Sequence, residues 1–184
     1  MYFKFLTFSL IYSYGKDSVL RGDIVKIYLA SSLHTDELKK RITTVVDFLR
    51  KKGHSVYSPM ELKIPNAWDL PNQEWAKKVY DNDIKELTNA DMIVCIYNGF
   101  NFAGGTGTAW ELGFAKAMNK DVIVLCTDIK SKQSLMIVNS GIIVMPYEEY
   151  EKAWWMYEGY KLGTKGVENL PPLPYIHPDL QDQS

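Results

Sequence analysis

From residue 24 to about residue 160, short runs rich in β-branched residues alternate with longer stretches in which apolar residues recur every three or four positions. This alternation is typical of β-α-β units, whose strands lie parallel and whose helices cover both faces of the sheet. We therefore predict an α/β fold: a five-stranded parallel sheet sandwiched by helices, in a flavodoxin-like or Rossmann-like arrangement. Ligands of such sheets bind beyond the carboxyl ends of the strands, so polar residues there are the first candidates for a site.

The individual elements follow from periodicity, caps and breakers. Thr35 is placed to cap a helix whose apolar positions repeat with helical spacing until Gly53. Prolines interrupt residues 60–72, which makes this the longest predicted loop, and long ordered loops tend to carry function. We expect strands at residues 24–30, 54–58, 91–97, 121–126 and 142–145, and further helices at residues 73–88, 108–119, 133–139 and 148–160.

One domain, residues 24–162, accounts for most of the chain. Residues 1–23 contain an aromatic, apolar stretch that lacks a small-residue cleavage site and is too short to span a bilayer. We expect them to form an N-terminal extension that is disordered or loosely docked, and we expect no membrane association. Residues 163–184 form a proline-rich tail without regular structure.

The charge balance argues against nucleic acid as a partner. The chain has 21 basic and 22 acidic side chains, a formal net charge of −1, and no strong positive field to hold a phosphate backbone. Cys95 and Cys126 each lie in an apolar run, where a buried free thiol behaves as a small hydrophobic group. Because no disulfide framework is indicated, we expect a cytoplasmic protein.

A glycine-rich loop precedes the helix predicted at residues 108–119. Gly104, Gly105 and Gly107 allow the backbone to turn tightly and to approach a ligand, while the helix points free N–H groups at it. The spacing matches neither the P-loop nor the dinucleotide-binding motif. A tight turn without a ligand is the alternative interpretation.

Glu111 follows this loop in what we predict to be the first turn of the helix. An acid there is favoured by the helix dipole and needs no other purpose. The alternative is functional: a carboxylate near free N–H groups stays ionised, as a nucleophile requires.

Asp83 is a second carboxylate in an unexpected position. It completes the helical stripe of Trp75, Val79 and Leu87, so it interrupts an apolar face, whereas Asp81 and Asn82 fall on other faces and are expected to be solvated. A charge within such a stripe has either a partner or a chemical role. Two carboxylates that converge in one site are the pair used to cleave glycosidic bonds.

Other kinds of chemistry find little support in the sequence. The histidines His34, His54 and His177 lack a spacing suited to a metal, and we expect neither a metal nor a cofactor. The aromatic residues between Tyr147 and Tyr160 are expected to lie in the core or in a subunit interface.

Several segments together resemble the nucleoside 2-deoxyribosyltransferase family, from about Lys26 to Ser140. They read KIYLASS, VYSP, YDNDIKELTNADMIV, GTAWELGFAKAMNKDVIVL and SLMI. The resemblance implies a covalent deoxyribosyl-enzyme: Glu111 attacks C1′ of the deoxyribose, Asp83 positions the sugar or the attacking group, and Tyr28 hydrogen-bonds the nucleophile. It also implies a homo-oligomer whose subunits share the site, with nucleosides or nucleotides and free nucleobases as small-molecule partners.

The sequence departs from this family at two positions. Gly105 stands where the transferases usually carry an aspartate that meets the nucleobase, and Ser134 stands where they tend to have an asparagine from the neighbouring subunit. Glu61 in the long loop is a candidate replacement for the missing acid. The backbone at Gly107 is a candidate contact to the substrate.

Three functions remain open at this stage. The leading hypothesis is a nucleoside 2-deoxyribosyltransferase. The second is the related deoxynucleoside 5′-monophosphate N-glycosidase, with water as acceptor and the phosphate held by Ser31, Ser32 and Ser134. The third is a non-catalytic nucleotide-binding module that keeps the fold alone.

Overall fold

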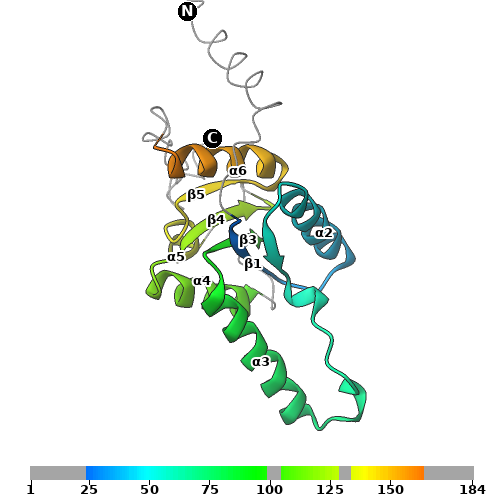
Figure 1. Ribbon diagram of the computed structural model, residues 1–184. Coiled ribbons are helices and arrows are strands. Elements are labelled where there is room, and N and C mark those ends of the chain that lie inside the picture. Colours follow the sequence, from blue (N-terminus) through cyan, green and yellow to red (C-terminus); the bar gives the residue numbers. More distant parts are fainter. Residues whose placement is uncertain (1–23, 99–104, 129–133, 164–184) are drawn as a thin grey trace, which may run out of the picture.

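The computed structural model describes residues 24–98, 105–128 and 134–163. Within them five parallel strands form one sheet of order β2-β1-β3-β4-β5 (Figure 1). The strands are β1 (Lys26–Ser31), β2 (Ser55–Tyr57), β3 (Met92–Tyr97), β4 (Asp121–Cys126) and β5 (Ile143–Pro146). The helices are α2 (Asp36–Lys51), α3 (Asn72–Asn89), α4 (Gly105–Ala117), α5 (Leu135–Val138) and α6 (Tyr150–Lys161). The predicted α/β fold is confirmed.

The sheet separates two hydrophobic cores because successive side chains of a strand point to opposite faces. On one face, Ile27 and Leu29 of β1 pack with apolar residues of α2 and α6. On the other, Tyr28 and Ala30 pack with Leu87 of α3 and with residues of α4 and α5. The cavity described below lies on this second face.

Helix α2 and the C-terminal aromatic residues behave as the sequence indicates. The Thr35 side chain accepts a hydrogen bond from the Leu38 N–H at 3.1 Å and so caps α2. Trp154 and Tyr157 of α6 are buried in the core, where Trp154 packs against His54. Most exposed aromatic residues lie in α3, α4 and the loop before α3, but Tyr160 near the end of α6 is also exposed.

Helix α3 is far less buried than its apolar stripe predicts. Leu87 is buried, but Trp75 is 45% exposed, and Figure 1 shows the first turns of α3 extending away from the sheet. The physical reason is length: an 18-residue helix spans about 27 Å, whereas a six-residue strand covers about 20 Å. The loop before it contains two single helical turns, η1 (Pro59–Glu61) and η2 (Ala67–Asp69).

Helix α4 begins at Gly105, three residues earlier than predicted. Glycine is a poor helix former, so residues 105–107 suggest a loop, but a first turn tolerates glycine because its N–H groups have no partner within the helix. Glu111 consequently lies in the second turn of α4. The prediction that it occupies the first turn is wrong.

The predictions for residues 1–23, for most of the glycine-rich loop including Gly104, and for residues 164–184 with His177 lie outside the described residues. Among the residues that are described, no helix is long and apolar enough to cross a membrane.

Candidate active site

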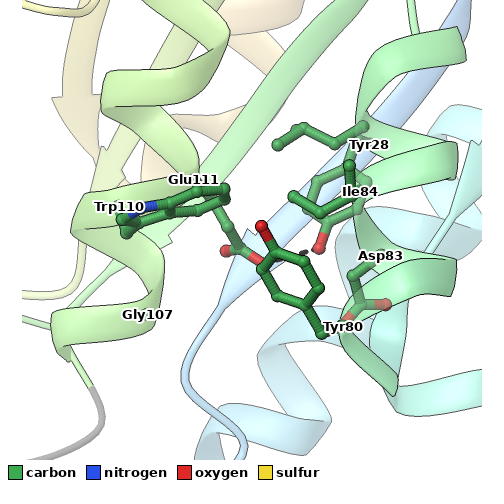
Figure 2. A pocket seen from close by; sticks show the side chains of 8 residues that line it. Tyr28, Tyr80, Asp83, Ile84, Gly107, Trp110 and Glu111 are labelled. Carbon is green, nitrogen blue, oxygen red and sulfur yellow. Dashed lines mark hydrogen bonds between the residues drawn. The ribbon is translucent and has the colours of Figure 1, made fainter. Parts of the chain in front are cut away.

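The centre of the site is a hydrogen bond between β1 and α4. The Tyr28 hydroxyl donates to Oε1 of Glu111 at 2.5 Å (Figure 2). Tyr28 is fully buried in the middle of β1, so its position is fixed by the sheet on both sides. The pair therefore holds a carboxylate at a defined place in front of the sheet.

The second carboxylate, Asp83 of α3, has a tyrosine partner of its own. The Tyr57 hydroxyl donates to Oδ1 of Asp83 at 2.7 Å and accepts a hydrogen bond from Nδ2 of Asn82, also at 2.7 Å. Asn82 is thus a half-buried hydrogen-bonding residue, and the prediction that it is solvated is wrong. Asp81 is exposed as expected and pairs with Lys77.

The two tyrosines link the two carboxylates. Tyr28 and Tyr57 are partners in adjacent parallel strands, and their ring centroids lie 5.5 Å apart. One tyrosine reaches Glu111 and the other reaches Asp83. The sheet register therefore sets how the two acids lie relative to each other.

Burial raises the pKa of both acids. It raises the pKa of Glu111 to about 7, an increase to which the nearby charge of Asp83 adds and which the hydrogen bond from Tyr28 opposes. Burial also raises the pKa of Asp83, against the effect of the Tyr57 hydrogen bond. Glu111 lies beyond the first turn of α4 and inside the protein, so burial, rather than the helix N–H groups, has the largest effect on its pKa.

Tyr28 stays protonated at neutral pH. Burial and the neighbouring Glu111 carboxylate raise the pKa of its hydroxyl far above the usual value. It is therefore a permanent hydrogen-bond donor to Glu111.

A cavity of about 320 Å³ opens in front of the two acids. Figure 2 shows α3 and α4 supplying its walls, with Tyr28 of β1 behind. This volume lies at the lower end of the range for small-molecule sites. The lining residues are Tyr28, Tyr80, Asp83, Ile84, Leu87, Gly107, Trp110 and Glu111.

Of the predicted substrate-binding residues, Gly107 lines this cavity. Gly105 is the first residue of α4. The Ser31 hydroxyl donates to the Ile96 carbonyl at 3.1 Å, and Ser134 precedes α5, where its backbone hydrogen-bonds Tyr97.

Ser32 and Glu61 also lie outside the cavity lining. Ser32 is buried, and its hydroxyl has no hydrogen-bond partner among the described residues. Glu61 forms an ion pair with Arg50 at 2.6 Å. The structure therefore gives Glu61 a partner other than a ligand.

Sequence reasoning missed several residues of the site. Tyr80 and Leu87 lie three before and four after Asp83, so helical spacing was a signal that could have identified them as lining residues, whereas Ile84, next to Asp83 in the chain, carried no such signal. Tyr57 carried no comparable local signal. The described residues contain no group of three or more His, Cys, Asp or Glu side chains that could hold a metal ion.

A family model for nucleoside 2-deoxyribosyltransferase matches residues 27–160. The chain belongs to the nucleoside 2-deoxyribosyltransferase family. The match includes every lining residue of the cavity and all of the sheet except Lys26, the first residue of β1. Members of this family are enzymes, which agrees with paired carboxylates in a cavity of small-molecule size.

Two solved structures are similar to this chain. A 2-deoxyribosyltransferase from the psychrotolerant bacterium Bacillus psychrosaccharolyticus is 29% identical, with a TM-score of 0.61, and the alignment covers 82% of this chain and 98% of the other. The CMP N-glycosidase BcmB from Clostridium botulinum is 22% identical over 71% of this chain and 98% of its own, with a TM-score of 0.49. No protein with curated annotation matches the sequence significantly.

Proposed function

We propose that the protein is a nucleoside 2-deoxyribosyltransferase, which cleaves the N-glycosidic bond of 2′-deoxynucleosides and passes the sugar to another nucleobase. The observation that carries the proposal is the Tyr28–Glu111 hydrogen bond in a cavity that Asp83 enters from the opposite helix. Family membership supports it independently.

The reaction divides into two displacements at C1′. In the first, an ionised Glu111 oxygen attacks C1′; the C1′–N bond breaks, its electron pair leaves with the base, and the departing base takes a proton from water. In the second, a nitrogen of the acceptor base attacks C1′; the bond between C1′ and the Glu111 oxygen breaks, its electron pair returns to the carboxylate, and the acceptor releases its N–H proton to water. Two inversions give net retention at C1′.

The tyrosines position the two acids in this scheme. Tyr28 holds one Glu111 oxygen, which leaves the other oxygen to face the sugar. Asp83, oriented by Tyr57, accepts a hydrogen bond from a hydroxyl of the deoxyribose or positions the attacking carboxylate.

The N-glycosidase is the second candidate, and Ser32 favours it. This side chain lies just beyond the carboxyl end of β1, where its buried hydroxyl lacks a partner among the described residues. A phosphate oxygen is one group that would satisfy it. Water would then replace the acceptor base.

We also propose a homo-oligomer in which the segment around Ser134 completes the neighbour's site. Leu135 is 50% exposed and Met136 is 82% exposed directly after Ser134. Contact with a second copy would remove this apolar surface from water. Sedimentation of a fully active species of about 21 kDa would contradict the shared site.

One experiment separates the candidate functions. The protein is incubated with 2′-deoxynucleosides or with their 5′-monophosphates, each with and without a second free base, and products are resolved by chromatography. A new nucleoside that forms only with the second base supports transfer; release of base from the monophosphate alone supports the N-glycosidase. Binding of these compounds without turnover in any mixture would support the third candidate, a non-catalytic nucleotide-binding module.

A further inference from the structure

Two exposed aromatic side chains stand at the mouth of the cavity. Tyr80 of α3 is 55% exposed and Trp110 of α4 is 48% exposed, although both line the cavity. Their ring centroids lie 6.0 Å apart with an interplanar angle of 55°. Figure 2 shows both rings beside the carboxylate of Glu111.

The structure also holds Trp110 in a fixed orientation. Its ring stacks on Phe114, one helical turn further along α4, with centroids 5.3 Å apart and an interplanar angle of 10°. Phe114 in turn packs against the core formed with β1 and β3. A rigid, half-exposed indole loses little conformational freedom when a ligand covers it.

The cavity has a polar side and an apolar side. Tyr28, Asp83 and Glu111 supply the hydrogen-bonding groups, whereas Ile84, Leu87 and the rings of Tyr80 and Trp110 supply apolar surface. A nucleoside has the same division, with a hydroxylated sugar joined to a flat, weakly polar base. With the sugar against the two acids, the base extends toward the aromatic mouth.

We propose that Tyr80 and Trp110 form a stacking platform that binds the nucleobase of donor and acceptor by its face. The proposal rests on the proposed function, since it takes the sugar to lie against Asp83 and Glu111. Stacking on an aromatic side chain is tolerant of base identity because every base has a π-face. It favours purines over pyrimidines, because a purine covers more of the platform.

The test measures binding of free bases, which contain no bond to cleave. Equilibrium dialysis with adenine and with cytosine compares the native protein with Trp110→Ala, Trp110→Phe and Tyr80→Ala. A matched control is Trp68→Ala, since Trp68 is fully exposed in η2 and does not line the cavity. An abasic probe, 1,2-dideoxyribose, reports on the sugar side alone.

We expect Trp110→Ala and Tyr80→Ala each to weaken adenine binding by about 5-fold to 150-fold, the range measured for single stacked bases. Trp110→Phe and Trp68→Ala should keep most of the affinity, and binding of the abasic probe should stay unchanged. The loss should be larger for adenine than for cytosine.

Unchanged adenine affinity in both alanine variants would overturn the platform, as would equal losses for adenine and the abasic probe. A lower sedimentation coefficient of Trp110→Ala with unchanged adenine affinity would overturn it too, by assigning this face to contact between copies. A native protein that binds adenine at this site but cleaves no nucleoside would contradict the proposed function and leave the platform standing.

Discussion

The hydroxyl of Tyr28 donates a 2.5 Å hydrogen bond to Glu111, although the two residues are 83 positions apart in the sequence. Tyr57, its neighbour in the sheet, does the same for Asp83 at 2.7 Å. Each acid of the site is thus positioned by a hydrogen bond from a strand as well as by the helix that carries it.

The first prediction concerns the stability cost of Glu111. Its pKa is about 7 in the folded protein and near 4.5 when unfolded, so the unfolded state binds fewer protons between these values and stability falls as pH rises. Glu111→Gln removes an ionising group and should raise the free energy of unfolding at pH 8.5 by about 3 kcal/mol, since one pKa unit corresponds to about 1.4 kcal/mol. Activity should be lost.

Urea denaturation at pH 5 and pH 8.5 measures this effect. The increase in the free energy of unfolding caused by Glu111→Gln should be small at pH 5, where the Glu111 side chain of the native protein is mostly protonated. An equal gain at both pH values would show that repacking, rather than ionisation, stabilises the variant.

The second prediction is a pH profile. If Glu111 attacks as a carboxylate, kcat/KM should rise with pH and level off above an apparent pKa of about 7. Asp83→Asn removes a charge that raises the pKa of Glu111, so its residual activity should level off at lower pH. Tyr28→Phe removes a hydrogen bond that lowers the pKa of Glu111, so the pH profile of this variant should move to higher pH. Shifts in the same direction for both variants would contradict the assigned causes.

The third prediction concerns Tyr57 as a positioning residue. Tyr57→Phe keeps the ring beside Tyr28 but removes the donor to Asp83 and the acceptor for Asn82. We expect kcat to fall about 10-fold to 100-fold, because misplacing a group by an ångström costs on that order. Asp83→Asn should lower kcat by a larger factor than Tyr57→Phe does.

Asp81→Asn is the matched control for these two variants, since Asp81 is an exposed acid on the same helix that pairs with Lys77. It should keep full activity. An unchanged kcat in Tyr57→Phe would show that Asp83 does not depend on the hydrogen bond from Tyr57 for its position.

The fourth prediction separates the two enzymatic candidates. In a transferase, Gly105→Asp should raise activity on plain nucleosides by restoring an acid near the base, and an acid at the start of α4 suits the helix dipole. In an N-glycosidase the same change should lower activity on 5′-monophosphates by repelling the phosphate. No change with either substrate would place residue 105 away from the ligand.

The sequence predicts the sheet to within a few residues because β-branched runs and glycine or proline breakers mark each strand. It also singles out Asp83, an acid within an apolar stripe, and Glu111, an acid that follows the glycine-rich loop, and both line the cavity. It does not reveal that Tyr57 meets Asp83, because that contact requires β1 and β2 to pair in one register. Nor does it give the raised pKa of Glu111, which depends on burial by elements distant in sequence.

The most direct test is to trap the intermediate. A 2′-fluoro-substituted deoxynucleoside slows both displacements, so a covalent sugar should accumulate when the native protein is incubated with it. Intact-mass and peptide mass spectrometry should then show one added fluorodeoxyribosyl group on the peptide that contains Glu111, and none in Glu111→Gln. An adduct on Asp83, or rapid turnover of ordinary deoxynucleosides in Glu111→Gln, would contradict Glu111 as the nucleophile.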